Sequence, residues 1–326
     1  MNAPLPLQLT PEAAARPATV VCLSVPFDLK KIFGGLDDAR LVLRDPEEIE
    51  RPEDVTAALC WNPADDAFDR FPNIRLAASI AAGVDGILAC PSLPAGAVVT
   101  RVRDDAQADL MAGYAAFAVL WHHRRMGDYV ANQAARKWVR SFRPAAPAAV
   151  PVGVLGYGLM GRAVARAIAA LGFPVIAAAR SGGEAMPGVE IVSGPGAIET
   201  VAARAKILVN VLPLTAETRD VLNADLFAKM PEGAALVQIG RGEHMIEDDF
   251  LAALDAGRIG SATLDVFRQE PLPENHPFWT HPRIMMTPHK ASDTSREETI
   301  RQLGLALDQL EAGLRPDAAV DREAGY

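Results

Sequence analysis

The chain of 326 residues has a formal net charge of −9, and 50% of its residues are hydrophobic. This length exceeds that of one typical domain and suits two lobes, each with enough apolar residues to form a core. The 32 basic residues are spread along the chain without a basic block, which argues against a nucleic-acid partner.

Residues 1–11 lack the basic start and the continuous apolar core of a signal peptide, and no later apolar run approaches the ~18 residues of a membrane span. The three cysteines are odd in number and lie in apolar stretches, at Cys22, Cys60 and Cys90. This pattern indicates reduced, buried thiols and no disulfide framework, and no residue spacing suggests a metal. We therefore expect a short loose tail, followed by a soluble cytoplasmic protein without a bound metal or membrane attachment.

Short apolar runs alternate with helical stretches from Ala18 onward, at residues 19–25, 39–43, 57–61, 76–80 and 97–100. Strands separated by crossovers predict a parallel α/β lobe. Residues 104–138 then carry apolar side chains at three-or-four spacing, which predicts a largely helical segment. The proline-rich residues 143–151 end that segment and lead into a new strand.

A second lobe begins at Val152, where a strand runs into a glycine-rich turn. A helix of about a dozen residues follows, Gly172 ends it, and another strand ends at Arg180. Further strands are predicted at 207–212, 235–239, 261–266 and 283–286, and a final helix at 293–313. The pattern predicts an α/β protein with two Rossmann-like, doubly wound parallel-sheet domains and a cleft between them.

The turn is Gly156-Tyr-Gly158-Leu-Met-Gly161, a Gly-x-Gly-x-x-Gly motif. Such a motif alone is weak evidence for nucleotide binding. Here, however, it follows a strand and opens a helix, which is the context in which it binds a dinucleotide. The amides of Leu159 and Met160 would then face the phosphates at the positive end of the helix.

The second strand of this unit ends at Arg180, followed by Ser181. An acidic residue at this position would bind the ribose 2′-hydroxyl of NAD, whereas a cation and a hydroxyl favour the 2′-phosphate of NADP. The sequence therefore predicts NADP(H) over NAD(H). The alternative is that Arg180 is a solvated surface residue.

Three polar residues, Arg241, Glu270 and His289, each follow a predicted strand of the second lobe. The carboxyl ends of parallel strands meet at one edge of the sheet, so we expect the three side chains to project from the edge that holds the glycine turn. An arginine can clamp a carboxylate, and a histidine paired with a glutamate can pass a proton. Singly, each residue also has an ordinary structural explanation.

Several motifs closely resemble those of the D-isomer-specific 2-hydroxyacid dehydrogenases, and within them the glyoxylate/hydroxypyruvate reductase A group. The resemblance covers nearly the whole chain. It rests on Ala-Ala-Gly-Val-Asp at 81–85, the glycine turn, Leu-Pro-Leu-Thr-Ala-Glu-Thr at 212–218, Leu-Asp-Val-Phe-Arg-Gln-Glu-Pro at 264–271, Thr-Pro-His at 287–289 and the terminal Val-Asp-Arg-Glu-Ala-Gly-Tyr.

The resemblance implies reduction of a small 2-keto acid with NADPH, glyoxylate to glycolate or hydroxypyruvate to D-glycerate. Residues 1–103 with 290–326 would bind the substrate, and 104–289 would bind the dinucleotide, with 104–145 as the dimerisation helix and arm of a homodimer. Arg241 would bind the substrate, His289 would donate the proton and Glu270 would hold the imidazole. The resemblance also implies that the Ala82 and Gly83 amides bind the substrate carboxylate and that Asp265 meets the nicotinamide amide. Leu212, Pro213 and Ile239 would border the dinucleotide, and Trp138 of a partner subunit would lie beside the active site.

Two positions depart from the family pattern. Lys290 replaces the usual apolar residue after the histidine, and the residues before Arg241 read Val-Gln-Ile-Gly where the family often has Val-Asn-Leu-Ala. Two other functions stay open: a reductase for a bulkier 2-keto acid, and a non-catalytic, dinucleotide-sensing binding protein like the related transcriptional corepressors. The other histidines, including His122 and His244, are given no role by the sequence.

Overall fold

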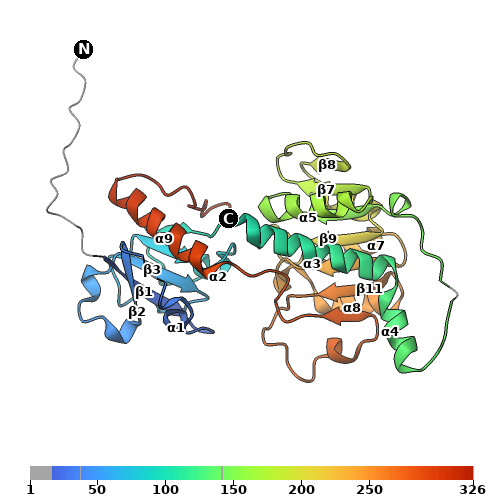
Figure 1. The fold of residues 1–326 in the computed structure, drawn as a ribbon, viewed down its shortest axis with the longest axis horizontal. Helices are drawn as coiled ribbons and strands as arrows, with labels where there is room; N and C mark the ends of the chain where they lie inside the picture. The colour runs from blue at the N-terminus through green and yellow to red at the C-terminus, as the bar shows by residue number, and fades with distance from the viewer. Residues whose placement is uncertain (1–16, 37, 141, 326) are drawn as a thin grey trace, which may run out of the picture. The chain divides into compact units, whose positions relative to one another are not determined.

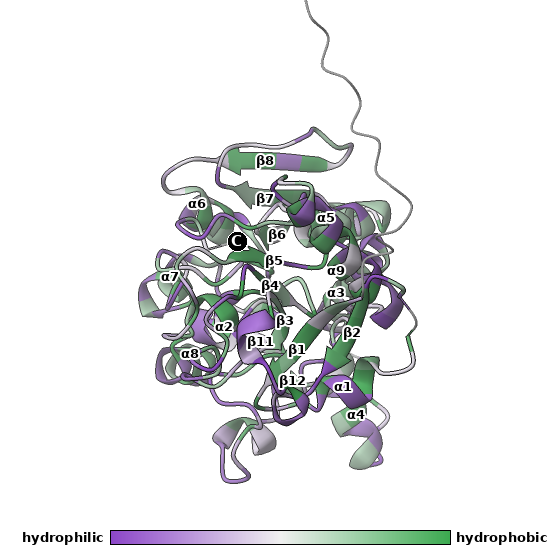
Figure 2. Cartoon of the chain, turned by 90° about the vertical axis from the view of Figure 1, so that its left-hand side faces the viewer, coloured by the Kyte–Doolittle hydropathy of each residue, from purple (hydrophilic) through white to green (hydrophobic). Residues whose placement is uncertain are grey.

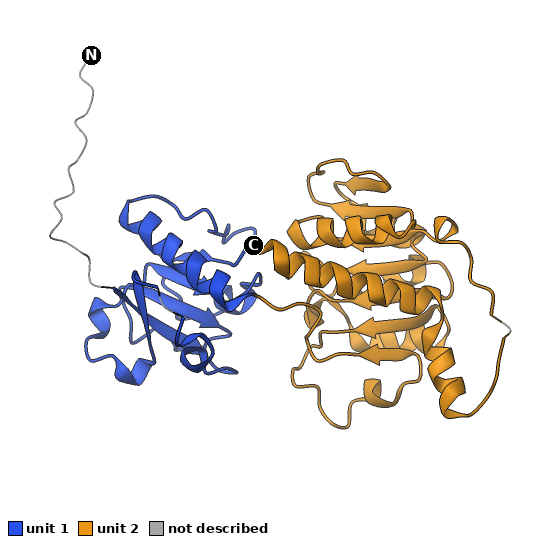
Figure 3. Cartoon of the chain, viewed as in Figure 1, with its two compact units in different colours: residues 1–103, 295–324, 326 blue, residues 104–294, 325 orange. Residues whose placement is uncertain are grey.

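The computed structural model describes residues 17–36, 38–140 and 142–325. These residues form two compact units (Figure 3). Unit 1 contains the described residues up to Arg103 and Ser295–Ala324, and unit 2 contains Asp104–Thr294 and Gly325. Residues 290–294, which we assigned to the substrate domain from the sequence, thus lie in unit 2. The binding role of each unit stays a prediction at this point.

Unit 1 is built on a five-stranded parallel sheet with the order β2-β1-β3-β4-β5. Its strands are β1 (Ala18–Ser24), β2 (Leu41–Arg44), β3 (Ala57–Trp61), β4 (Leu76–Ser79) and β5 (Val98–Thr100), and its helices are α1 (Leu29–Phe33), α2 (Asp85–Leu88) and α9 (Arg296–Glu311). Alternate residues of β1 enter opposite cores, as a strand buried on both faces requires. Val20 packs with α1 and α9, whereas Val21 packs with α2. Figure 2 shows β1 and β2 mainly in the colour of hydrophobic residues.

Unit 2 is built on a seven-stranded parallel sheet with the order β12-β11-β10-β9-β6-β7-β8. Its strands are β6 (Val152–Leu155), β7 (Val175–Ala179), β8 (Val189–Ser193), β9 (Ile207–Asn210), β10 (Ala234–Gln238), β11 (Ile259–Leu264) and β12 (Ile284–Met286). Its helices are α3 (Asp105–His123), α4 (Met126–Ala134), α5 (Leu159–Ala170), α6 (Ala197–Arg204), α7 (Ala224–Lys229) and α8 (Glu247–Asp255).

Helices cover both faces of this sheet. Figure 1 shows α3 and α5 side by side, and their buried residues share one core with the sheet. Residues of α6, α7 and α8 pack into a second core on the other face. The chain runs outward from β6 to β8 and returns at β9, so the strand order reverses between β6 and β9. Such a reversal leaves a crevice at the carboxyl edge, where doubly wound folds bind their ligands.

The predicted fold class, two parallel-sheet α/β domains, is confirmed. The sequence reading missed β8, because this edge strand is half exposed and lacks a buried apolar run. The segment predicted as largely helical, 104–138, is divided at Arg125, whose φ of 51° is incompatible with a continuous helix. All three cysteines are free and buried, as predicted. Within the described parts of the chain, no helix has both the length and the apolar character to cross a bilayer.

Candidate active site

Arg241 follows β10 at the carboxyl edge of the unit 2 sheet. Its amide donates to Nδ1 of His244 at 3.1 Å, and its guanidinium donates to the Gly240 carbonyl at 2.9 Å. Gly242 lets this loop pass directly against the backbone of Phe267 and Arg268, with which any Cβ at position 242 would overlap. The tight passage brings the Arg241 segment beside the segment that carries Glu270.

A buried polar network shapes the Arg241 loop, and its members are Asn210, Gln238 and His244. The side-chain amide of Asn210 donates to Gln238 Oε1 at 2.7 Å and to His244 Nδ1 at 3.0 Å. The side-chain amide of Gln238 donates to the Arg241 carbonyl at 2.8 Å. Because Nδ1 of His244 accepts twice, its ring is neutral with the proton on Nε2, which donates to the Pro213 carbonyl at 3.2 Å.

This network was not predicted from the sequence. His244 was given no role there, yet it is fully buried and bonded to the backbone of Arg241. Gln238, noted only as a departure from the family pattern, supplies the side chain that holds the Arg241 carbonyl. The available signal was the three polar residues within three positions of Arg241, namely Gln238, Glu243 and His244.

Glu270 and His289 form a direct pair, although they come from loops after two different strands. Nδ1 of His289 lies 2.8 Å from Oε2 of Glu270, while the Phe267 amide donates to Oε1 at 2.9 Å. Burial opposes ionisation of Glu270, but the hydrogen bond and charge of His289, the Phe267 amide and the charge of Arg241 outweigh it and lower the pKa of the carboxyl. A carboxylate on Nδ1 leaves Nε2 of His289 for another partner.

Asp265 follows β11 and is 1% exposed. Its Oδ1 accepts from the Thr287 hydroxyl at 2.5 Å and from the Lys290 amide at 2.8 Å, and its Oδ2 accepts from the Ala291 amide at 2.9 Å. The carboxylate therefore ties the ends of β11 and β12 to the loop of His289. Its predicted contact with a nicotinamide amide stays a prediction.

The glycine turn has the geometry that the motif predicts. Gly156 has a φ of 99°, a conformation that favours glycine, and a Cβ at Gly161 would overlap the Gly156 carbonyl. A Cβ at Gly158 would meet no described atom within 4 Å, so the backbone is open to a ligand there. Leu159 and Met160 begin α5, whose first amides are available to phosphate. These features fit a bound dinucleotide.

Arg180 and Ser181 follow β7 and are both exposed. Glu217 bonds to Thr215, which lowers the pKa of its carboxyl, and the charge of Arg180 contributes to the same shift. The guanidinium therefore lies near the loop that carries Thr215 and Glu217. The residues predicted along the dinucleotide lie at the same sheet edge: Leu212 donates its amide to Asn210 Oδ1 at 3.3 Å, the Pro213 carbonyl accepts from the Thr218 hydroxyl at 2.7 Å, and Ile239 is 3% exposed.

Three residues that were predicted to contact the substrate, Ala82, Gly83 and Trp138, lie outside the sheet edge that carries Arg241, Glu270 and His289. Ala82 and Gly83 lie in unit 1 after β4, where the Ser79 hydroxyl donates to the Gly83 carbonyl at 2.6 Å. Their approach to Arg241, like the expected cleft, stays a prediction. Trp138, which follows α4, is 92% exposed. Lys290 pairs with Asp293, so its charge is balanced within its own loop.

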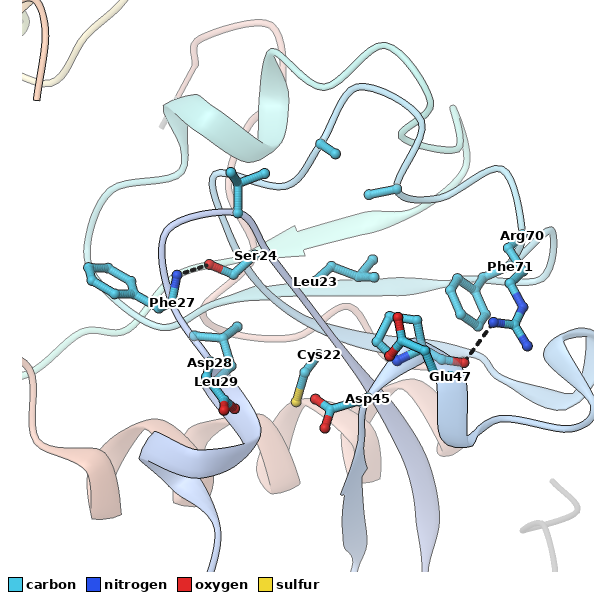
Figure 4. Close-up of a pocket in the computed structure, with 14 residues that line it drawn as sticks. Cys22, Leu23, Ser24, Phe27, Asp28, Leu29, Asp45, Glu47, Arg70 and Phe71 are labelled. Carbon is cyan, nitrogen blue, oxygen red and sulfur yellow. Dashed lines mark hydrogen bonds between the residues drawn. The ribbon is translucent and has the colours of Figure 1, made fainter.

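A separate pocket of about 460 Å³ lies in unit 1 (Figure 4). Residues at the ends of β1 and β2 line it, among them Cys22, Asp28 and Asp45, together with Arg70 and Phe71. None of the predicted site residues lines this pocket. Burial, more than the neighbouring carboxylates, raises the pKa of Cys22 to about 12, so the thiol is unreactive. Among the residues described, no cluster of histidine, cysteine and acidic side chains is arranged to hold a metal ion.

A glycine turn at the switch point of a doubly wound sheet, with an arginine and a glutamate–histidine pair at the same edge, is the arrangement of a dinucleotide-dependent dehydrogenase. Comparison with known proteins agrees. Residues 116–291 match the family model "D-isomer specific 2-hydroxyacid dehydrogenase, NAD binding domain". The chain therefore belongs to the D-isomer specific 2-hydroxyacid dehydrogenase family and is an oxidoreductase.

Individual relatives cover most of the chain. A glyoxylate/hydroxypyruvate reductase A from Serratia proteamaculans is 38% identical over 282 residues, covering 85% of this chain and 89% of the relative. A family member from Xanthobacter autotrophicus, solved with NADPH and MES, has a TM-score of 0.87 and 35% identity and covers 96% and 100% of the two chains. An NADPH-dependent glyoxylate/hydroxypyruvate reductase from Sinorhizobium meliloti, solved with NADP and sulfate, has a TM-score of 0.86 and 32% identity and covers 95% and 100%.

Proposed function

We propose that this chain reduces small 2-keto acids with NADPH, converting glyoxylate to glycolate and hydroxypyruvate to D-glycerate. The observation that carries the proposal is the 2.8 Å pair of His289 and Glu270 in the same unit as Arg241 and the glycine turn. The reductases named in the comparisons support the substrate class, and the relatives solved with NADPH or NADP support the cofactor.

Bound NADPH supplies the hydride for the reduction. His289 donates a proton from Nε2 to the carbonyl oxygen as negative charge develops there, and Glu270 stabilises the imidazolium on the other ring nitrogen. Arg241 binds the substrate carboxylate, together with the Ala82 and Gly83 amides. Asp265 would meet the nicotinamide amide, and Leu212, Pro213 and Ile239 would border the dinucleotide.

The cofactor residues fit a 2′-phosphate. Arg180 and Ser181 offer a cation and a hydroxyl at the end of β7, where an NAD enzyme would carry an acidic residue. Gly156, Gly158 and Gly161 would admit the pyrophosphate, and the amides of Leu159 and Met160 would bind it at the start of α5.

We also propose a homodimer that pairs through α3. Its side chains Leu110, Phe117 and Leu120 are 55%, 49% and 37% exposed, an apolar stripe that a partner subunit would cover. Trp138, 92% exposed beyond α4, would then wall the partner's active site. Light scattering that gives a mass near that of one 34.7 kDa chain at micromolar concentration would contradict pairing.

The decisive experiment compares glyoxylate, hydroxypyruvate, pyruvate and phenylpyruvate, each with NADPH and with NADH, by loss of reduced-cofactor absorbance. We expect the first two substrates with NADPH to be the fastest. Preference for phenylpyruvate would indicate the bulkier substrate class. Cofactor binding without turnover of any substrate would indicate a dinucleotide-sensing binding protein.

His289→Ala tests the proton donor directly. Loss of a positioned general acid costs about 10²- to 10⁴-fold in rate, so kcat should fall by that factor while NADPH binding, measured by fluorescence, stays unchanged. Near wild-type turnover of glyoxylate by this variant would show that His289 is not the donor.

A further inference from the structure

Tyr114 has no part in the mechanism above, yet it begins a chain of hydrogen bonds that leads to the loop of His289. It lies on α3, and its hydroxyl is 2.5 Å from Thr287 Oγ1, while the Thr287 hydroxyl donates to Asp265 Oδ1 at 2.5 Å. Thr287 has a single hydroxyl proton and gives it to Asp265, so its oxygen accepts from Tyr114. Burial raises the pKa of Tyr114 to about 12, which keeps its hydroxyl a donor at neutral pH.

This series of hydrogen bonds continues through Asp265 into the backbone that follows His289. Oδ1 of Asp265 accepts from the Lys290 amide and Oδ2 from the Ala291 amide, at 2.8 and 2.9 Å. The carbonyl of Asp265 also accepts from the His289 amide at 2.8 Å. One residue therefore binds three successive amides of this loop.

The loop needs such support because His289 has a φ of 55°. The left-handed conformation is unfavourable for a residue with a Cβ, so surrounding contacts must hold His289 there. In this backbone conformation the His289 ring lies 2.8 Å from Glu270, so the proposed function depends on it. A rotated Asp265 carboxylate would release the Lys290 and Ala291 amides and, with them, the ring.

We propose that Tyr114 and Thr287 are positioning residues, which orient the Asp265 carboxylate and thereby fix His289 against Glu270. The proposal rests on the proposed function, because it assigns these two residues to the same proton-donating site. Neither hydroxyl touches the substrate; each acts through the next member of the chain. A helix of the expected dimer interface thus helps to define the geometry of the proton donor.

Thr287→Val and Thr287→Ser form a matched pair. Valine keeps the shape of threonine and removes the hydroxyl, whereas serine keeps the hydroxyl. Misplacement of a catalytic group by about 1 Å costs on the order of 10²-fold. We therefore expect Thr287→Val to lower kcat about 10- to 100-fold with the KM for glyoxylate nearly unchanged, and Thr287→Ser to recover most of the rate. Thr263→Val, which removes a buried hydroxyl from β11 that bonds to His122, serves as the control; it should lower stability and leave kcat unchanged.

Tyr114→Phe tests the first link. Loss of one hydrogen bond of about 0.5–1.5 kcal/mol corresponds to about a 2- to 10-fold fall in kcat. Because Tyr114 acts only through Thr287, adding Tyr114→Phe to Thr287→Val should cause no further fall. Additive losses in the double variant, or equal rates for the valine and serine variants, would overturn the proposal.

A readout independent of turnover separates this proposal from the proposed function. The NMR signals of the His289 ring, identified by their loss in His289→Ala, should shift in Thr287→Val toward their positions in Glu270→Gln. If the ring signals shift and the wild type reduces no 2-keto acid, the positioning stands and the proposed function fails. If His289→Ala abolishes turnover but Thr287→Val leaves both ring and rate unchanged, the proposed function stands and the positioning fails.

Discussion

The histidine at position 122 should make folding of this protein sensitive to mild acid. The His122 side chain reaches from α3 to β11, where Nδ1 lies 2.8 Å from the Ser261 hydroxyl and Nε2 lies 2.8 Å from the Thr263 hydroxyl. Two hydroxyls satisfy a neutral imidazole completely, since one accepts the ring proton and the other donates. Burial lowers the pKa of His122 to about 4.

The direction and size of this pH dependence of stability follow from the difference in the pKa of His122 between the native and the unfolded state. The unfolded chain takes up the proton near pH 6.5, while the native state resists it down to about pH 4, so the native state loses stability as pH falls through this window. The full difference between the two pKa values corresponds to roughly 3 kcal/mol of unfolding free energy, of which about 2 kcal/mol is lost by about pH 5. Above about pH 6.5 the effect is absent.

Urea unfolding at about pH 8 and about pH 5 measures this difference in the wild type, in His122→Gln and in His122→Leu. Both variants lose stability at pH 8, because each disturbs the contact with β11, but neither has a titrating group at this position. Between the two pH values, the free energy of unfolding of the wild type should fall by about 2 kcal/mol more than that of either variant. Equal pH dependence in all three proteins would refute the argument that His122 is held neutral by burial.

Three further predictions concern the active site. Arg180→Ala removes a charge-assisted phosphate contact worth about 1.5–3 kcal/mol, so kcat/KM should fall about 10- to 100-fold with NADPH and stay nearly constant with NADH; equal losses would place Arg180 outside the phosphate site. Glu270→Gln removes the charge that stabilises the imidazolium, so the fall of the reduction rate with rising pH should move to lower pH, and an unchanged pH–rate profile would contradict the pairing. Gly242→Ala forces a Cβ into the Phe267 backbone. The resulting strain of about 1–3 kcal/mol should lower Tm by several degrees and also reduce kcat. A Tm equal to that of the wild type would show that the loop can relax.

The features that the sequence predicted correctly depend on local pattern. The strand, glycine turn and helix around Gly156–Gly161 follow from apolar runs and from residues with restricted roles. The carboxyl-edge position of Arg241, Glu270 and His289 follows from strand order in a parallel sheet. Strand β8 was missed because its side chains are half exposed and its position is set by pairing with β7, a contact that no local pattern encodes.

The contacts that hold the site could not be read from the sequence for a different physical reason. His244 and Gln238 are polar residues whose burial depends on partners from β9 and on the Arg241 backbone, and Tyr114 meets Thr287 across 173 residues. An uncompensated buried polar group costs roughly 1–3 kcal/mol, so each of these side chains is tolerated only because a distant segment completes its hydrogen bonds. The proposed reacting residues can thus be found from their local motifs. The residues proposed to orient them can be found only once the fold has brought their partners together, and in this chain they connect His289 to a helix of the expected subunit interface.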